Sequence, residues 1–296
     1  MAPSGSTVSL PLTTHDDKGI SFTVDISVGG GAPFPVLLDT GSTGLYVEQG
    51  VVGSAVTTPS PAQNFSMTYA KGQLTGTLQS AVVDLGGVST SGPVTFGTYA
   101  SGSGNSSFGV AAKGILGIAA GSGGENPTVM AVQGLLPAPY DSGSTLTGAQ
   151  LGGSPGSWVL GPVAAPAAGA VQVPLTAEGS GGGVTGWGKD VTLCWAFNQG
   201  TSTCGATDLD SGAGSVLLGE GKPGVPAASE TLTDVAITTP SGQAVWSFAP
   251  GSSTVQTEVM TLGGATVFNT SNHIYLGRTI AFDYVGGTVT IGPASS

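Results

Sequence analysis

A short apolar run leads into an acidic turn in the stretch Phe34-Pro-Val-Leu-Leu-Asp39-Thr40-Gly41-Ser42-Thr43-Gly44-Leu45-Tyr46-Val47. Its Val and Leu residues favour a β-strand, and the Gly that follows the acid lets the backbone bend sharply. Hydroxyl groups on both sides of Gly41 can donate hydrogen bonds to the Asp39 carboxylate. The stretch therefore predicts a strand that ends in a rigidly held acid.

A second copy of this pattern lies 171 residues later, in Asp208-Leu209-Asp210-Ser211-Gly212-Ala213-Gly214-Ser215-Val216-Leu217-Leu218. One such turn alone is a weak signal, because Asp, Thr and Gly are common in ordinary turns. Two copies, each beside apolar residues, indicate a functional pair. We expect Asp39 and Asp210 to act together.

Other elements of the chain repeat at a similar offset. The pattern Val-x-x-Pro-Leu-Thr occurs at residues 8–13 and again at 171–176, an offset of 163. A nearly constant offset is typical of an internal duplication with small insertions. We therefore expect two related lobes, residues 1–168 and 169–296, each large enough to bury its own core.

Short alternating strands, separated by Gly, Ser and Pro, recur along the chain and predict an all-β protein. Residues 126–136 are the exception. Asn126 is a favourable helix cap, Pro127 suits a first helical turn, and Pro137 follows the last apolar residue. This segment therefore predicts a helix.

Together these features resemble the pepsin-like aspartic proteases, and the resemblance covers most of the chain. Residues 66–78, with Tyr69, Lys71 and Gly72, are similar to the hairpin, or flap, that covers the substrate in this family. Residues 113–118 and 274–278 are similar to the apolar-apolar-Gly elements that follow each catalytic Asp. Among bilobal members, the low charge and the richness in Gly, Ser and Ala are most similar to the protease domain at the C-terminal end of mycobacterial PE-PGRS cell-surface proteins.

The resemblance implies a bilobal acid-protease fold, with two related β-barrel-like lobes and a cleft between them. It makes Asp39 and Asp210 the catalytic pair, supported by the turn residues Thr40, Gly41, Ser42, Ser211, Gly212 and Ala213. The hydroxyls of Thr40 and Ser211 are expected to cross-link the turns, and that of Ser42 to donate to Asp39. Tyr46 stands where the family usually has a Trp that supports the flap Tyr.

Ala213 departs from the family pattern, because it occupies the position of Ser42 in the second copy and has no hydroxyl. Loss of a hydrogen-bond donor disfavours the charged form of a carboxylate. The sequence therefore predicts that Asp210 is the protonated partner of the pair.

Two carboxyl groups a few ångströms apart share one proton, because ionising both is costly. The ionised member can take a proton from a water molecule while the neutral member hydrogen-bonds the scissile carbonyl oxygen. The expected activity is aspartic endopeptidase hydrolysis of a polypeptide substrate, without metal or cofactor and sensitive to a pepstatin-type inhibitor. Two alternatives stay open: a weak or inactive pepsin-like surface domain that binds peptide or a host protein, and a purely structural β-rich module.

Charge composition argues against nucleic acid as a partner, since 6 Lys and Arg stand against 17 Asp and Glu. No apolar run reaches the roughly 18 residues of a membrane-spanning helix, and the N-terminus lacks a signal-peptide pattern. Either the chain is cytoplasmic or it is a domain excised from a longer protein. The resemblance favours an excised, secreted or cell-surface domain, which we expect to be a monomer. We expect His15 and His273 at the surface rather than in a metal site.

Cys194 and Cys204 flank the residues Asn198-Gln199-Gly200. If these three form a hairpin turn, the two cysteines face each other on antiparallel strands at a Cα separation of about 4.5 Å, which allows a disulfide. Two buried free thiols are the alternative. A disulfide would indicate an oxidising, extracytoplasmic compartment.

Overall fold

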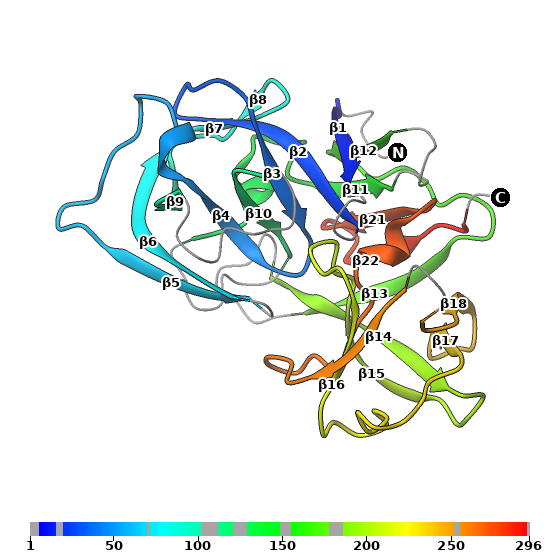
Figure 1. The fold of residues 1–296 in the computed structure, drawn as a ribbon. Helices are drawn as coiled ribbons and strands as arrows, with labels where there is room; N and C mark the ends of the chain where they lie inside the picture. Colours follow the sequence, from blue (N-terminus) through cyan, green and yellow to red (C-terminus); the bar gives the residue numbers. More distant parts are fainter. Residues whose placement is uncertain are drawn as a thin grey trace.

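Strands make up nearly all of the regular structure in the computed structural model, which describes residues 6–15, 20–69, 72–101, 112–120, 129–148, 155–177, 186–251 and 255–294 (Figure 1). Within these ranges there are 22 strands, three short 3₁₀-helices and no α-helix. The all-β prediction is confirmed.

The described part of residues 1–168 contains twelve of the strands and two of the 3₁₀-helices. They are β1 (Val8–His15), β2 (Ser21–Val28), β3 (Phe34–Asp39), β4 (Thr43–Glu48), η1 (Gln49–Val51), β5 (Asn64–Tyr69), β6 (Gly72–Ala81), β7 (Val83–Leu85), β8 (Val88–Ser89), β9 (Val94–Tyr99), β10 (Gly114–Ile118), η2 (Val132–Leu135), β11 (Gly143–Thr147) and β12 (Gly156–Leu160).

The described part of residues 169–296 contains the other ten strands and one 3₁₀-helix. They are β13 (Val171–Ala177), β14 (Trp187–Phe197), β15 (Thr203–Asp208), β16 (Val216–Gly219), β17 (Val235–Thr238), β18 (Ala244–Phe248), β19 (Thr257–Met260), β20 (Phe268–Asn269), η3 (Asn272–Tyr275), β21 (Thr279–Asp283) and β22 (Thr288–Ile291).

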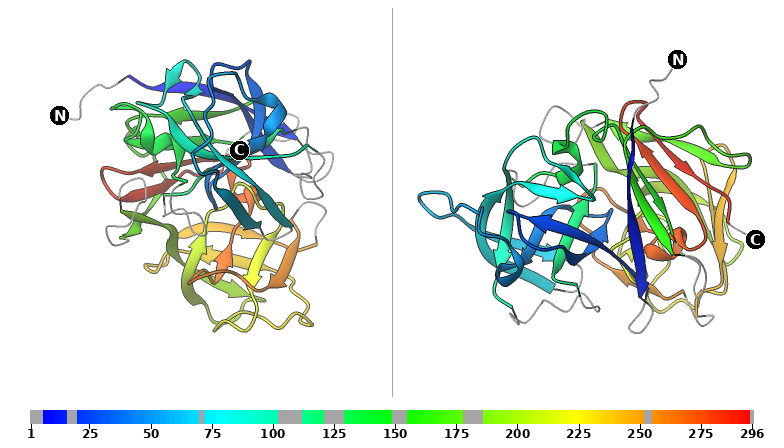
Figure 2. Two further views of the ribbon diagram at one scale, coloured as in Figure 1. Left: turned by 90° about the vertical axis from the view of Figure 1, so that its left-hand side faces the viewer. Right: turned by 90° about the horizontal axis from the view of Figure 1, so that it is seen from above.

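A six-stranded antiparallel sheet joins the two halves of the chain. Its order is β1-β12-β11-β21-β22-β13, so three strands come from each half. The strands that open the two halves, β1 and β13, form the two edges. In the right-hand view of Figure 2, blue and green strands of the first half lie beside red strands of the second. The two halves are therefore built into one shared sheet.

Each half contains the same arrangement of strands around its Asp turn. In the first half β10 lies between β3 and β4, parallel to β3 and antiparallel to β4, and β9 runs parallel to β4. In the second half β20 lies between β15 and β16 in the same sense, and β19 runs parallel to β16. In each half, the strands before and after the Asp turn are therefore not neighbours in the sheet. The turn connects two strands that lie on opposite sides of a third.

Alternating burial explains how these segments become strands. In β13, Val171, Val173 and Leu175 are buried while the residues between them are exposed, as a period of two residues predicts. Trp158 on β12 and Trp195 on β14 are fully buried, and each indole N–H donates to a buried hydroxyl oxygen. The core therefore contains large side chains whose polar atoms are hydrogen-bonded.

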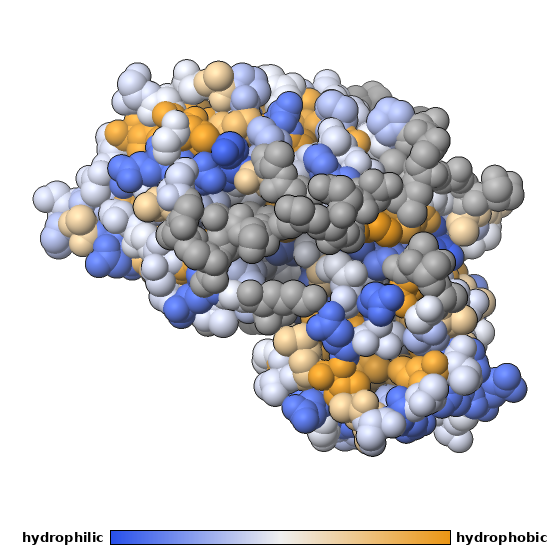
Figure 3. Space-filling view, viewed as in Figure 1, coloured by the Kyte–Doolittle hydropathy of each residue, from blue (hydrophilic) through white to orange (hydrophobic). Residues whose placement is uncertain are grey.

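The face shown in Figure 3 mixes hydrophilic and hydrophobic side chains among the residues drawn in colour. Orange side chains gather in small groups, one of them over the lower part, where Figure 1 draws β14 to β16. Among the described residues, the large hydrophobic side chains that are exposed are Val82 and Val285. Most apolar residues of the described ranges therefore contribute to the interior.

The predicted helix at residues 126–136 is wrong for the part that the structure describes. Residues 126–128 lie outside the described residues, and from Val129 onward the segment forms only η2 (Val132–Leu135). Val129, Ala131 and Val132 are all buried. An α-helix would turn Val129 and Ala131 to opposite sides, so burial of both favours a non-helical path.

The predicted second apolar-apolar-Gly element is also wrong. Residues 113–118 do contain β10, which lies beside β3, but in the second half the equivalent place belongs to β20 rather than to residues 274–278. Ile274 and Tyr275 lie in η3 instead and are fully buried. β20 has only two residues, so no apolar pattern in the sequence marks it.

Cys194 on β14 and Cys204 on β15 face each other and form a disulfide. The hairpin turns at Asn198 and Gln199, whose φ angles of 52° and 56° lie in the left-handed region that Asn tolerates. The two sulfur atoms are therefore bonded to each other rather than free.

Candidate active site

The two acidic turns meet between the halves of the chain. Asp39 is the last residue of β3, and Asp210 follows β15 by two residues. A Cβ atom on Gly41 would lie 2.5 Å from the carboxyl carbon of Asp210, and one on Gly212 would lie 2.5 Å from that of Asp39. Each carboxyl group therefore packs over the glycine of the opposite turn, where a larger residue would not fit.

Asp39 accepts three hydrogen bonds from its own turn. The backbone N–H groups of Gly41 and Ser42 donate to Oδ1 at 2.8 and 3.2 Å. The Ser42 hydroxyl donates to Oδ2 at 2.5 Å. Asp39 is only 5% exposed, so these contacts replace most of its hydration.

Asp210 also accepts three hydrogen bonds, although Ala213 has no hydroxyl. The backbone N–H groups of Gly212 and Ala213 donate to Oδ1 at 2.7 and 3.2 Å. The third donor is the side-chain amide of Asn269 on β20, whose Nδ2 lies 2.7 Å from Oδ2. The prediction that Asp210 is the protonated partner rested on a missing donor, and that premise is wrong.

Thr40 and Ser211 cross-link the two turns. The Thr40 hydroxyl donates to the carbonyl oxygen of Leu209 and accepts from the Ser211 N–H at 2.8 Å. In the other direction, the Ser211 hydroxyl donates to the carbonyl oxygen of Leu38 at 2.7 Å and accepts from the Thr40 N–H at 3.0 Å. Each hydroxyl therefore bonds a donor and an acceptor of the opposite turn, which holds the two aspartates in one relative position.

Tyr275 on η3 supports this cross-link, and sequence reasoning does not identify it. Its hydroxyl donates to the carbonyl oxygen of Leu209 at 2.7 Å and lies 3.0 Å from the Thr40 hydroxyl. Burial raises the pKa of the Tyr275 hydroxyl well above its usual value, so the group stays neutral. The contact joins residues 235 positions apart, so no local pattern could reveal it.

Burial raises the pKa of Asp39 well above its ordinary value, and the negative charge of Asp210 raises it further. The hydrogen bond from Ser42 acts in the opposite direction, because it stabilises the charged form. Two carboxyl groups placed in this way titrate as a coupled pair. The arrangement can therefore provide an acid and a base side by side.

The expected flap is the hairpin of β5 and β6, in which Tyr69 pairs with Gly72. Lys71, which lies between these two residues in the sequence, is outside the described residues. Tyr69 packs against an apolar cluster that includes Leu37, two residues before Asp39. The hairpin and the strand that carries the first acid therefore share one apolar cluster.

Tyr46 belongs to the same apolar cluster as Tyr69. It is fully buried on β4, and its ring centroid lies 4.9 Å from that of Phe65 on the hairpin. Tyr46 therefore packs beneath the base of the hairpin.

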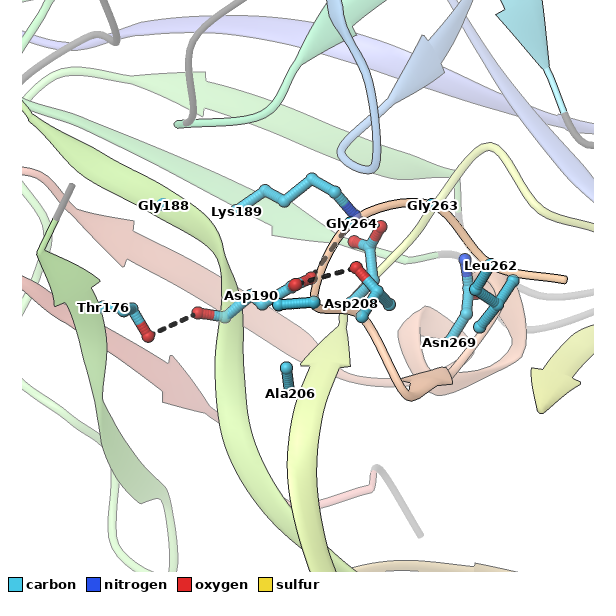
Figure 4. A pocket seen from close by; sticks show the side chains of 12 residues that line it. Thr176, Gly188, Lys189, Asp190, Ala206, Asp208, Leu262, Gly263, Gly264 and Asn269 are labelled. Carbon is cyan, nitrogen blue, oxygen red and sulfur yellow. Dashed lines mark hydrogen bonds and ion pairs between the residues drawn. The ribbon is translucent and has the colours of Figure 1, made fainter. Parts of the chain in front are cut away.

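A pocket of about 440 Å³ lies beside the second turn (Figure 4). Asp208 and Asn269, which both adjoin Asp210, contribute to its lining. The ammonium group of Lys189 on β14 points toward Asp208 and forms an ion pair with it. The Nζ atom of Lys189 also lies 3.3 Å from Oδ1 of Asp190. The pocket beside the second turn therefore contains three charged side chains among small and apolar ones.

Asp208 carries opposing electrostatic influences. Burial raises its pKa to about 7, although the Lys189 charge lowers it. The unfolded chain would release this proton near the ordinary pKa of 3.8, whereas the folded protein keeps it to about 7. This difference in pKa between the folded and unfolded states stabilises the folded protein fully below pH 4, and the stabilisation is lost as the pH rises to 7.

We therefore expect Asp208→Asn to reduce the pH dependence of stability, because Asn has no proton to lose. Urea unfolding of both proteins at several pH values between 4 and 7 measures this dependence. The free energy of unfolding should fall more steeply with rising pH in the wild type than in the variant. Asp84→Asn, at an exposed turn, is the control and should keep the wild-type slope. Equal slopes for Asp208→Asn and the wild type would contradict the assignment.

Each of the two histidines lies beside a hydroxyl group. His273 is only 5% exposed and its Nδ1 lies 3.0 Å from the Ser271 hydroxyl, so the surface position expected for it is wrong. His15 is half-buried, and its Nε2 lies 2.9 Å from the Thr23 hydroxyl. Across the described ranges, no three His, Cys, Asp or Glu side chains are grouped to hold a metal ion. Within the same ranges, no helix has the length and apolar character needed to cross a membrane.

Comparison of the sequence finds no matching family model and no matching curated protein. Comparison of the structure does find matches, with 389 chains of solved structures. One of them is an aspartic proteinase from Irpex lacteus, which matches with a TM-score of 0.66 at 16% sequence identity and with 98% of each chain covered. The chain therefore has the fold of the pepsin-like aspartic proteinases over nearly its full length.

Proposed function

We propose that this chain is an aspartic endopeptidase in which a water molecule held between Asp39 and Asp210 attacks the peptide bond. The observation that carries the proposal is the packing of each carboxyl group over the glycine of the opposite turn. A structural module would not need a second carboxyl group packed beside the buried Asp39, because burying an acid next to another acid is costly. Their placement is therefore best explained by catalysis.

In the proposed reaction, one carboxyl group is neutral and the other is ionised. The ionised group takes a proton from the water as its oxygen bonds to the carbonyl carbon, and the neutral group donates its proton to the carbonyl oxygen. The resulting tetrahedral intermediate then breaks its C–N bond: the carboxyl group that took the water proton gives it to the amide nitrogen, and the other carboxylate takes a proton from a hydroxyl of the intermediate, which restores the starting state of the pair. No group of the protein forms a covalent bond to the substrate.

The remaining residues would support binding and orientation. The β5–β6 hairpin with Tyr69, Lys71 and Gly72 would close over an extended peptide and exclude water, and Tyr46 would hold its base. The peptide would lie in a cleft between two lobes, residues 1–168 and 169–296, of a protein that acts as a monomer.

An extracytoplasmic location is part of the proposal. The bond between Cys194 and Cys204 supports it, because disulfides persist in oxidising compartments. The resemblance to the protease domain of mycobacterial PE-PGRS proteins fits the same location, secreted or at the cell surface, as a domain excised from a longer chain.

The test is cleavage of a denatured protein substrate at acid pH by the purified chain. Acid pH is chosen because the proposed pair works with one proton, which is lost at high pH. We expect the amount of fragments to increase with time. Pepstatin should stop the cleavage, whereas a metal chelator should not. Pepstatin should also raise the unfolding temperature of the chain, because a ligand that binds only the folded state stabilises it.

These two measurements separate the leading proposal from its main alternative. A chain that is stabilised by pepstatin but yields no fragments would be a peptide-binding domain without turnover. A chain that cleaves its substrate equally well with pepstatin would contradict the aspartic mechanism.

A further inference from the structure

We propose that Asn269 is a positioning residue for Asp210 and that it replaces the hydroxyl donor missing at Ala213. The proposal rests on the proposed endopeptidase function, in which Asp210 is half of the catalytic pair. Asn269 Nδ2 donates to Asp210 Oδ2 at 2.7 Å, just as the Ser42 hydroxyl donates to Asp39 Oδ2 at 2.5 Å. Both aspartates therefore have two backbone donors and one side-chain donor. For Asp39 the side-chain donor comes from its own turn, and for Asp210 it comes from β20.

Asn269 occupies the position in the second half that Ile115 occupies in the first. The strand partners are Leu37 and Tyr46 for Ile115, and Asp208 and Leu217 for Asn269. Adding 171, the offset between the two aspartates, to 37 and 46 gives 208 and 217. The first half thus has a hydroxyl at Ser42 in the turn and an apolar residue, Ile115, on β10. The second half has no hydroxyl at Ala213 in the turn and a polar residue, Asn269, on β20.

The orientation of the Asn269 amide is set by a second hydrogen bond. Its Oδ1 accepts from the backbone N–H of Ser271 at 2.8 Å, which leaves Nδ2 to face Asp210. Asn269 is only 5% exposed, so water does not compete freely for either contact. An amide nitrogen can donate but not accept, so this contact favours a bare carboxylate oxygen at Oδ2.

The matching geometry of the two turns suggests a direct rescue. The backbone donors lie 2.8 and 3.2 Å from Asp39 Oδ1, and 2.7 and 3.2 Å from Asp210 Oδ1. A serine introduced by Ala213→Ser would therefore place its hydroxyl near Asp210 Oδ2, as Ser42 does for Asp39. The lost donor can thus be restored from the turn itself.

We expect Asn269→Ala to lower kcat roughly ten- to a hundredfold with little change in KM, the scale of one hydrogen bond to a charged group. Both limbs of the pH profile should move to higher pH by about one unit, because a donor favours the ionised carboxylate and its removal favours proton binding. Ser42→Ala removes the corresponding donor from Asp39 and is the matched control. It should shift the profile in the same direction.

The double variant Ala213→Ser/Asn269→Ala should recover kcat to within about threefold of the wild type and return the pH profile to its original position. A purely structural role for Asn269 would not predict this rescue. If the double variant is as slow as Asn269→Ala and has the wild-type urea midpoint, the proposal is overturned. Unchanged kcat and pH limbs in Asn269→Ala would overturn it as well.

One further measurement applies if Asn269→Ala does not fold. By NMR, the Asn269 side-chain amide signal should move with pH in Asp208→Asn, which removes the neighbouring acid on β15, and should move much less in Asp208→Asn/Asp210→Asn. A signal that ignores pH would overturn the positioning role even in a chain that cleaves no peptide, so this result is independent of the proposed function.

Discussion

Asp39→Asn and Asp210→Asn should each lower kcat at least about a hundredfold, because each removes one member of the proposed acid–base pair. Asn keeps the size of Asp and can still accept the backbone hydrogen bonds of its turn. The free energy of unfolding should therefore change little. Initial rates of peptide cleavage at acid pH, together with urea unfolding, measure the two effects separately.

Asp283→Asn is a control with the same local geometry. Asp283 Oδ1 accepts the backbone N–H groups of Val285 and Gly286, two and three residues later, at 3.0 and 2.8 Å. This repeats the turn of Asp39 at an exposed site. We expect wild-type kinetics for Asp283→Asn, whereas retention of more than roughly a hundredth of kcat in either dyad variant would contradict the proposed pair.

Thr40→Val should reduce the free energy of unfolding by about 2–3 kcal/mol, because it leaves a buried Ser211 N–H without its acceptor and removes the bond to Leu209. Val has nearly the shape of Thr, so the loss reports the hydroxyl rather than a cavity. We also expect kcat to fall, because catalytic groups that move by about 1 Å can lose roughly a hundredfold in rate.

Thr57→Val provides the comparison at the surface. The Thr57 hydroxyl donates to the carbonyl oxygen of Ser80 at 3.2 Å in an exposed position, where water can replace it. The same change should alter stability by less than about 0.5 kcal/mol there. If Thr40→Val and Thr57→Val destabilise the protein equally in urea, the cross-link between the turns contributes no special stability.

Several features of the fold follow from local patterns. The alternation of apolar and polar residues in Val171–Ala177 predicts a strand that is buried on one face, and the structure contains that strand. The pairing of Cys194 with Cys204 follows from the length of one hairpin turn, because a short turn fixes which residues face each other. Such features depend on residues close in sequence, so the sequence contains enough information to predict them.

The errors arise where packing overrides a local signal. Asn126 and Pro127 suggest a helix start, but Val129 and Ala131 are both buried and no α-helix forms in the described part of the segment. Residues 274–277 have an apolar-apolar-Gly pattern, yet the strand in the equivalent place is β20, which has two residues. In both cases the position of a segment depends on its neighbours in space.

The sequence alone determines that two acidic turns exist, that apolar strands lead into them, and that small residues adjoin each acid, because these properties lie within a few consecutive residues. The donors and supports around the acids come from elsewhere. Asn269 reaches Asp210 across 59 positions of the chain, and Tyr275 reaches Thr40 across 235. The Asn269 contact exists because β20 is inserted between β15 and β16, and the Tyr275 contact because η3 packs against the turns. Placement of this kind follows from the packing of the whole core rather than from any single stretch.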